Sequence, residues 1–440
     1  ASSALWNLRN LYKVFIMKRI RLFTLLAVLL CATTSWAQTI VSSDDELRSA
    51  IANGANITVT ADIELSNSTL SIPANNTVTI NLGGHKLDRK LTKRGEGGGQ
   101  VITVRSGATL NLSNGTLKGG WGRDGGGLVN EGGSVTLTDV NITNNTADDR
   151  GGGISNHGTL NMTGGSISGN TTNDQTAPEG GGGFMNSAGA TATLTGVTIS
   201  GNKVNVKGGG GICNYGTMTL DGCTVTGNSC KMNGGGIWTV ASATLNMQGV
   251  INVTDNTSDG GITNNLFLKT NAVVTITGSL AGSTMGVNME ANTGTFTSGY
   301  GTHNSGVDPA TIFKADIEGV MNVSLNDAGN EAQLVNAIPE GSVYYVERSW
   351  DEDEKCVKYE NKILQSGEYK VLNGSDNQIT ELAPGYYVVK GNVEYHWLYC
   401  TGAGKYHLIL CDGAKLTARS VRVEKNFNSE LYIYGQARGS

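Results

Sequence analysis

The strongest candidate for catalysis in this sequence is one short charged segment. Asp148, Asp149 and Arg150 are consecutive, and His157 follows them closely. Hydrolysis of a glycosidic bond needs two placed carboxylates, and an Asp-bound calcium ion with a basic residue can support sugar elimination. Adjacent residues of a strand point to opposite faces, however, and this pair immediately precedes a run of glycines. We therefore predict a solvated turn here and assign no catalytic residue.

A second motif could bind calcium. Residues 119–124, Gly-Gly-Trp-Gly-Arg-Asp, match the start of a calcium-binding nonapeptide. That motif works in tandem, because neighbouring turns share the ion, and here it occurs once and is followed by Gly125 where an apolar residue is expected. Four other histidines lie apart, with no Cys or carboxylate at ligand spacing. We predict no metal site and no cofactor; the four histidines are His85, His303, His396 and His407.

Aromatic residues could form a surface on which sugars stack. Tyr215 and Trp238 follow glycine runs at positions that could face outward, and Trp121 lies in the glycine-rich segment described above. Phe184 occupies the inward position of its run and is expected in the core. Two exposed aromatic residues do not define a site, so we assign no ligand-binding residue.

The elements that position these residues belong to one repeat written five times. Each copy opens with three glycines and an apolar residue, at intervals of 26, 30, 28 and 25 residues. Apolar residues then alternate, which is the period of a strand, and a second stretch ends in Asn. A propeller blade would need about 40 residues, and a leucine-rich repeat has a different apolar pattern. We predict an all-β right-handed parallel β-helix solenoid; the copies begin at Gly125, Gly151, Gly181, Gly209 and Gly234.

Stacked coils bring equivalent residues above one another, so the alternating apolar residues should form a narrow core. Cys223 is expected within that core as a small apolar residue. Glycine supplies the positive φ or close backbone approach that coil corners need. The residues expected to be buried are Ile154, Leu160, Ile167, Leu194, Ile199, Leu220 and Val225.

Asparagine recurs at two places in each unit. Asn170, Asn202 and Asn228 close successive units, and coils lie about 4.8 Å apart, so their amides should stack at one corner and bond between coils. A second set follows the glycine runs. These residues are also interpreted as structural, and they are Asn130, Asn156, Asn186 and Asn214.

The chain divides into segments of different composition. Residues 1–16 precede a plausible initiator Met and are interpreted as non-native upstream translation, and residues 17–37 as a signal peptide. Residues 38–124 are expected to form a cap and the first coils, because Ser43-Asp44-Asp45-Glu46 is a capping-box pattern that predicts a short helix. Residues 125–338 hold the repeats and closing coils. Residues 339–440 are rich in Tyr, Glu and Lys and predict a second β module, interpreted as the truncated start of another solenoid.

The signal-peptide prediction rests on a basic start, an apolar run and a small-residue cleavage site before Gln38. The apolar run is half of the roughly 20 residues needed to cross a bilayer, and no later run is long enough. We therefore expect an exported chain without a membrane-spanning segment after cleavage. An anchor or sorting signal beyond residue 440 is left open.

Charge and cysteine content exclude several classes of partner and site. The net charge is -5, and residues 1–37 carry five basic residues and no acidic ones, so the remaining chain is more acidic. Without a basic cluster, neither nucleic acid nor an anionic lipid surface is an expected partner. Six cysteines follow residue 37 at irregular spacings, with no close pair for zinc. We interpret them as isolated structural residues and leave any disulfide pairing open.

The units from Gly125 to Asn256, with openings such as GGGISN and closings such as SISGN, resemble repeats of polymorphic outer membrane proteins and adhesin-like β-helices of Gram-negative bacteria. The segment DDELRSAIANGANITVTADIEL is similar to the start of many exported pectate-lyase-like β-helices. These resemblances imply the fold, export and display at the cell surface or outer membrane.

Together these observations predict a secreted or surface-displayed structural and adhesive protein, monomeric and without catalytic activity. Its long surface would meet a polysaccharide, a matrix ligand or a host surface glycoprotein. The alternative is a polysaccharide lyase or glycoside hydrolase of the pectate-lyase-like fold, because that fold also supports such enzymes.

Overall fold

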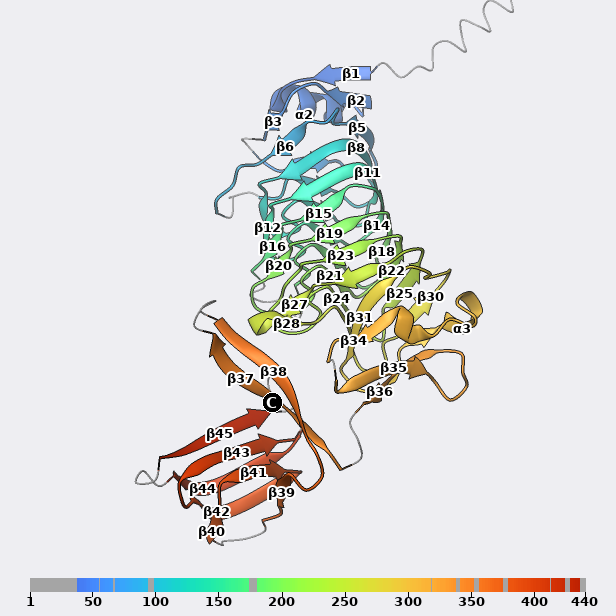
Figure 1. Ribbon diagram of the computed structural model, residues 1–440. Helices are drawn as coiled ribbons and strands as arrows, with labels where there is room; N and C mark the ends of the chain where they lie inside the picture. The colour runs from blue at the N-terminus through green and yellow to red at the C-terminus, as the bar shows by residue number, and fades with distance from the viewer. Residues whose placement is uncertain are drawn as a thin grey trace, which may run out of the picture.

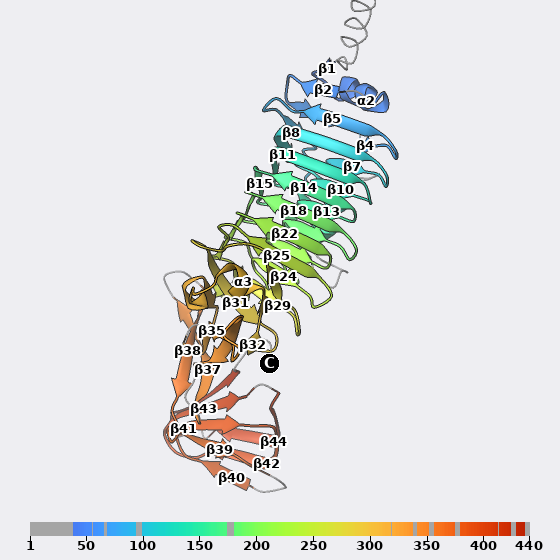
Figure 2. The same cartoon turned by 90° about the vertical axis from the view of Figure 1, so that its right-hand side faces the viewer.

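The computed structural model describes residues 38–435, apart from residues 55, 66–67, 94–98, 174–179, 318, 338–340, 352–355, 375–378, 412 and 424–427. The predicted upstream segment and signal peptide lie outside the described residues. The protein is all-β, with 54% of residues in strands, and forms a right-handed parallel β-solenoid of about 14 turns. Figures 1 and 2 show the coils stacked along one axis. The predicted fold class is confirmed.

Each coil contributes strands to three long parallel stacks. The first stack contains β1 (Gln38–Val41), β2 (Asn56–Val59), β5 (Thr77–Asn81), β8 (Thr109–Lys118), β11 (Ser134–Thr143), β14 (Thr159–Thr163), β18 (Thr191–Thr195), β22 (Thr217–Asp221), β25 (Thr244–Gln248), β30 (Val274–Ile276) and β33 (Thr297–Ser298). The second contains β3 (Ile63–Glu64), β6 (Lys86–Asp88), the second halves of β8 and β11, β15 (Ser166–Ser168), β19 (Thr198–Ser200), β23 (Thr224–Thr226), β26 (Asn252–Thr254), β31 (Thr284–Met289) and β34 (Phe313–Ala315). The third contains β4 (Leu70–Ile72), β7 (Ile102–Val104), β10 (Leu128–Asn130), β13 (Ile154–Asn156), β17 (Phe184–Asn186), β21 (Ile212–Asn214), β24 (Ile237–Thr239), β29 (Leu266–Leu268) and the end of β31.

The core lies between these stacks and contains the predicted residues. All seven predicted apolar side chains are fully buried, and so is Cys223. The Cys223 thiol donates to the Leu194 carbonyl at 3.2 Å, which satisfies its only donor. Register pairs equivalent residues of successive coils, as in Ile167 with Ile199 and Ile199 with Val225. The predicted strand register is therefore confirmed.

The glycine runs form coil corners, as predicted, by two different means. Gly151 opens its run with a φ of 65°, which favours glycine. Gly152 has ordinary φ but no room, because a Cβ there would lie 2.5 Å from the Gly182 carbonyl oxygen of the next coil. Neighbouring corners therefore approach more closely than a side chain permits.

The predicted N-terminal helix is α2 (Asp44–Ala52). Ser43 is its N-cap and accepts a hydrogen bond from the Glu46 backbone N–H. The Glu46 carboxylate accepts from the Ser42 backbone N–H at 2.7 Å, one residue before the partner expected in a capping box. The apolar face of the helix, including Leu47 and Ile51, is buried in the solenoid core.

The last coils of the first solenoid differ from the repeats. β27 (Thr257–Ser258) and β28 (Ile262–Thr263) pair antiparallel around the short helix η2 (Asp259–Gly261). β33 is only two residues long, and helix α3 (Tyr300–His303) begins shortly after it. After η3 (Pro309–Thr311), the chain forms β35 (Met321–Leu325) and β36 (Ala332–Asn336), and β36 pairs antiparallel with both β35 and the earlier strand β32 (Gly294–Thr295).

The second β module begins with an antiparallel hairpin of β37 (Val343–Asp351) and β38 (Cys356–Leu364). Two parallel sheets follow, which is the pairing expected of solenoid coils. One contains β39 (Tyr369–Leu372), β41 (Gly385–Val389), β43 (Gly404–Leu410) and β45 (Ser429–Gly435). The other contains β40 (Ile379–Leu382), β42 (Asn392–Cys400) and β44 (Lys415–Val423), and a separate apolar core lies between the two sheets.

Candidate functional surface

A short fourth stack of strands brings together residues that the sequence offers as candidates for catalysis or calcium binding. It consists of β9 (Trp121–Asp124), β12 (Thr146–Arg150), β16 (Thr171–Thr172) and β20 (Lys203–Val204), which pair in parallel. Thr146 is in register with both Trp121 and Thr171. The 119–124 motif and the Asp148–Arg150 segment therefore lie on neighbouring coils.

Two reciprocal ion pairs join these coils. The Arg123 Nε lies 2.7 Å from an Asp149 oxygen, and the Arg150 Nε lies 3.0 Å from an Asp124 oxygen. The hydrogen bond from Arg123 to Asp149 raises the pKa of the arginine. Asp149 is only 6% exposed. The prediction of a solvated turn is therefore wrong: the segment is a strand, and its Asp149 and Arg150 pair with opposite charges on the adjacent coil.

A row of polar side chains runs along the outside of the same stack, and we call Trp121, Asp148, Asn173 and Asn205 the polar row. The Trp121 Nε1–H donates to Asp148 Oδ1 at 2.8 Å. The Asn173 amide donates to the same oxygen at 3.4 Å, and the Asn205 amide donates to Asn173 Oδ1 at 3.1 Å. All four residues are partly exposed. The row therefore presents planar hydrogen-bonding groups in a fixed order along the solenoid axis.

His157 directly follows β13 of the third stack. Its Nε2 and the Ser155 hydroxyl are 3.1 Å apart. Desolvation by surrounding atoms lowers the pKa of His157, and the charge of Arg150 lowers it further. Asp148 and Asp149 point to opposite faces of β12, as their burial pattern shows. The charge of Arg150 thus acts on His157, while Asp149 forms an ion pair with Arg123.

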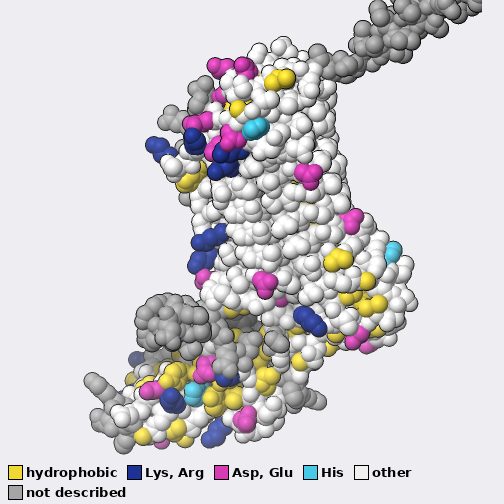
Figure 3. All heavy atoms as spheres, turned by 45° about the horizontal axis from the view of Figure 1, so that its top comes forward, with side chains coloured by type: hydrophobic (Ala, Val, Ile, Leu, Met, Phe, Trp, Pro, Cys, Tyr) yellow, Lys and Arg dark blue, Asp and Glu magenta, His cyan; other side chains and the backbone are white. Residues whose placement is uncertain are grey.

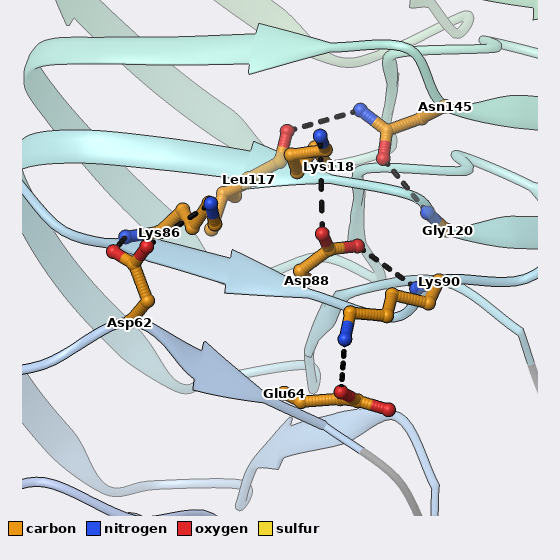
Figure 4. A network of polar contacts seen from close by, with 9 residues as sticks. All are labelled: Asp62, Glu64, Lys86, Asp88, Lys90, Leu117, Lys118, Gly120 and Asn145. Carbon is orange, nitrogen blue, oxygen red and sulfur yellow. Dashed lines mark hydrogen bonds and ion pairs between the residues drawn. The ribbon is translucent and has the colours of Figure 1, made fainter.

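A second charged group covers the first coils. Figure 3 shows acidic and basic side chains gathered there, whereas most of the repeat face in that view is uncharged. The Lys86 Nζ lies 3.0 Å from Asp62, and their hydrogen bond lowers the pKa of Asp62. Lys90 contacts Glu64 through its ammonium group and Asp88 through its backbone N–H (Figure 4). Asp88 is buried, whereas the other groups are exposed and neutralise one another, so they do not form a strongly charged patch.

The predicted amide ladder is present and longer than expected. Asn145 donates to Asn170, Asn170 to Asn202, and Asn202 to Asn228, all through side-chain amides at 2.9–3.0 Å. The series continues through Asn256 and Asn265 and ends on the carboxylate of Asp316. At its start, the Gly120 N–H donates to Asn145 (Figure 4). The prediction that these three asparagines stack at one corner is confirmed.

The second set of asparagines forms another buried ladder. Asn130 donates to Asn156, Asn156 to Asn186, and Asn186 to Asn214, at 2.8–2.9 Å. Asn214 then donates to the Thr239 hydroxyl at 3.3 Å. These amides are fully buried, so they are structural and are not part of a surface site.

Among the aromatic candidates, Phe184 lies in the main core, as expected. Trp238 does not face solvent: it is 5% exposed and packs in a small cluster with Met185, Cys213 and Phe267. Tyr215 lies against it, with ring centroids 5.2 Å apart. Trp238 lies outside the main core, as expected, but side chains of neighbouring coils cover it, and this covering was not predictable from strand alternation.

Two aromatic residues that sequence reasoning missed lie in the second module. Trp397 and Tyr399 are partly exposed on β42, with ring centroids 5.9 Å apart and planes within 3° of parallel. Their i, i+2 spacing in the sequence YHWLYC was the available signal, because that spacing places two side chains on one face of a strand.

Within the described ranges, no group of three or more His, Cys, Asp or Glu is arranged to hold a metal ion. The described cysteines are free thiols: Cys213, Cys223, Cys230, Cys400 and Cys411. No helix in the described part of the chain is both long and apolar enough to cross a membrane.

These features define an all-β protein of the parallel β-helix class, with a polar surface row and buried amide ladders. Comparison with family models, curated proteins and solved structures found no match to the chain. The adhesin-like and pectate-lyase-like resemblances therefore remain predictions.

Proposed function

We propose that the protein is an exported adhesive β-helix whose solenoid surface binds glycans through the polar row. The observation that carries this proposal is the line of hydrogen bonds from Trp121 through Asp148 and Asn173 to Asn205. Sugar hydroxyls both donate and accept hydrogen bonds, and carboxylate and amide groups offer matching acceptors and donors. An indole beside them adds an apolar surface suited to a sugar ring.

The row is also ordered before any ligand binds. Each side chain is held by its neighbour on the next coil, at distances between 2.8 and 3.4 Å. Binding therefore loses less side-chain entropy than it would at independent surface residues. A linear glycan lying along the solenoid axis would meet equivalent groups at about 4.8 Å intervals, the spacing of paired strands.

We propose binding rather than catalysis because the carboxylates beside the row are already engaged. Asp124 and Asp149 are each held by an arginine, and Asp148 accepts two hydrogen bonds. A glycosidase acid or nucleophile instead needs a carboxyl group that can reach the substrate.

The test uses the purified chain with a panel of neutral and acidic polysaccharides, with and without calcium, measuring both binding and chain cleavage. Asn205→Ala and Asp148→Asn should weaken binding about tenfold each, the effect of losing one good hydrogen bond. Asn161→Ala is the matched control, since Asn161 is exposed on the first stack, away from the row. Release of unsaturated or reducing ends would support the enzyme alternative. Unchanged glycan binding by both row variants would show that the polar row does not bind glycans.

Export is the second part of the proposal. It is supported by the signal-peptide pattern of residues 17–37, with its small-residue cleavage site before Gln38. Expression in a Gram-negative host should yield exported protein whose N-terminal residue is Gln38. Retention of an uncleaved chain in the cytoplasm would contradict export.

A further inference from the structure

The two parallel sheets of the second module differ in what covers their outer faces. The β37–β38 hairpin packs on the sheet of β39, β41, β43 and β45, where Tyr345 contacts Tyr386 and Tyr434. Val388 and Ile409 are fully buried under the same hairpin. The hairpin thus covers much of the apolar outer face of this sheet, while Tyr432 on β45 stays partly exposed.

The other sheet consists of β40, β42 and β44 (Figure 2). Partly exposed aromatic residues of β42 lie on its outer face. Leu398 and Cys400 of β42 point into the core between the sheets, so Trp397 and Tyr399 point outward. Their rings are parallel within 3°, with centroids 5.9 Å apart. We call this pair the aromatic platform, and Figure 3 shows hydrophobic side chains gathered over this module.

Charged residues surround the platform on the neighbouring strands. Tyr399 is in register with Glu381 on β40 and with Arg422 on β44, and both are exposed. Arg419, also exposed on β44, donates to His396 Nε2 at 3.4 Å. In the described part of the chain, no carboxylate pairs with Arg419 or Arg422. The β44 side of the platform therefore has two guanidinium groups available to an anion, and the β40 side has an acceptor.

We infer that the aromatic platform binds a carboxylate-bearing pyranose, such as a glucuronate unit of an acidic glycan. A pyranose whose ring substituents are all equatorial has two faces made of C–H groups, and such a face packs against aromatic rings. Arg422 and Arg419 match the sugar carboxylate, because a guanidinium can donate two parallel hydrogen bonds to it. Glu381, on the opposite side, accepts from ring hydroxyls. Orientation is thus set by charge: the carboxylate faces β44.

The site adds a ligand class to the proposed adhesive function, but it does not depend on the polar row. The test measures binding of hyaluronan oligosaccharides to the full chain by calorimetry, beside the same oligosaccharides with their carboxylates methyl-esterified. The free acid should bind about tenfold more tightly than the ester, the effect expected of one ion-paired contact. Trp397→Ala and Tyr399→Ala should each weaken binding of both forms about tenfold or more.

Arg422→Ala should remove the preference for the acid while leaving binding of the ester unchanged, and Arg422→Lys should restore part of that preference. Tyr432→Ala is the matched aromatic control, because Tyr432 is a partly exposed residue of the other sheet. Asn161→Ala lies outside both the row and the platform and should leave hyaluronan binding unchanged. The platform is judged by the preference for the acid over the ester and its loss in Arg422→Ala, and the row by Asn205→Ala on the polysaccharide panel, so the two failures are separable. Equal binding of acid and ester, or unchanged binding by a folded Trp397→Ala, Tyr399→Ala double variant, would overturn the inference.

Discussion

At the residue scale, the buried amides are stable because each one uses its hydrogen-bonding groups fully. The Asn202 amide donates to Asn228 Oδ1 and to the Ile167 carbonyl, while its own oxygen accepts from the Asn170 amide and backbone N–H. Burying such a group without partners would be unfavourable. Repetition solves this problem, since each coil supplies the partner that its neighbour needs.

Replacing Asn202 by Ala should therefore destabilise the solenoid strongly. The change leaves two donors of Asn170 and one carbonyl without partners, at about 1–3 kcal/mol for each unsatisfied group. Thermal unfolding followed by circular dichroism should show a clear fall in midpoint. Asn161→Ala, at an exposed position, should shift stability by no more than about 0.5 kcal/mol. Equal midpoints for the two variants would contradict the role assigned to the ladder.

The ladder ends on Asp316, whose carboxylate needs only to accept hydrogen bonds. Its carboxylate receives the Asn265 backbone N–H at 2.6 Å and the Asn265 amide at 2.7 Å. Burial raises the pKa of Asp316 to about 6, although both hydrogen bonds oppose this shift. Between the ordinary pKa of 3.8 and about 6, the folded chain holds this proton more than the unfolded chain does.

The contribution of Asp316 to stability is thus complete below pH 3.8 and is lost as the pH rises through about 6. Asp316→Asn cannot ionise and keeps only one acceptor oxygen, so one of the two Asn265 donors loses its partner by an amount that does not depend on pH. The difference in unfolding free energy between the parent and this variant should therefore change across that pH window and level off on both sides. A constant difference from pH 3 to pH 7 would mean that Asp316 does not titrate in this way.

At the element scale, the glycine corners allow the coils to stack closely. A Cβ on Gly182 would lie 2.3 Å from the Gly210 carbonyl oxygen, so any side chain pushes two coils apart. Gly196 differs, since its φ is +63° and nothing lies within 4 Å of a Cβ placed there. Glycine is required at position 182 by the close approach of the next coil. At position 196 it is favoured by the backbone conformation.

Gly196→Ala should cost about 1–2 kcal/mol, the penalty of a left-handed conformation for an L-residue. Gly182→Ala should cost more, because backbone atoms of the next coil must move. Urea unfolding of both variants provides the comparison. If Gly182→Ala proves the milder change, close approach is not what selects glycine at these corners.

At the scale of the whole molecule, each coil of the repeat contacts chiefly its two neighbours, so coils should be removable as units. Asn202 and Asn228 occupy equivalent corners, and each receives the donors of the preceding ladder residue. Removing residues 203–228 would join Asn202 to Ser229, and Asn256 would take the place of Asn228.

This deletion should give a folded protein that is shorter by about 4.8 Å along its axis, the spacing of one strand. Removing residues 203–215 instead deletes part of a coil and misaligns all three stacks. Small-angle scattering and circular dichroism should show a compact β protein for the first deletion and a strongly destabilised chain for the second. Similar behaviour of both deletions would contradict the picture of coils as interchangeable units.

The sequence by itself determined the repeat, the strand period and the core. Alternation placed Leu160, Ile167 and Val225 inside, and the recurrence of Asn170, Asn202 and Asn228 predicted a ladder. These features follow from local spacing combined with a constant coil rise, so no long-range information was needed. The short N-terminal helix was likewise predictable from its cap.

Only the tertiary structure decided how different coils combine their charged and exposed residues. Arg123 and Asp149 are separated by a full coil, and their pairing turned a predicted solvated loop into a strand. Trp238 lies outside the main core yet is covered by side chains of neighbouring coils, whereas Trp397 stays partly exposed on the outer face of its sheet. The physical reason is that local period sets which face a side chain occupies, but what lies against that face depends on chain segments a coil or more away.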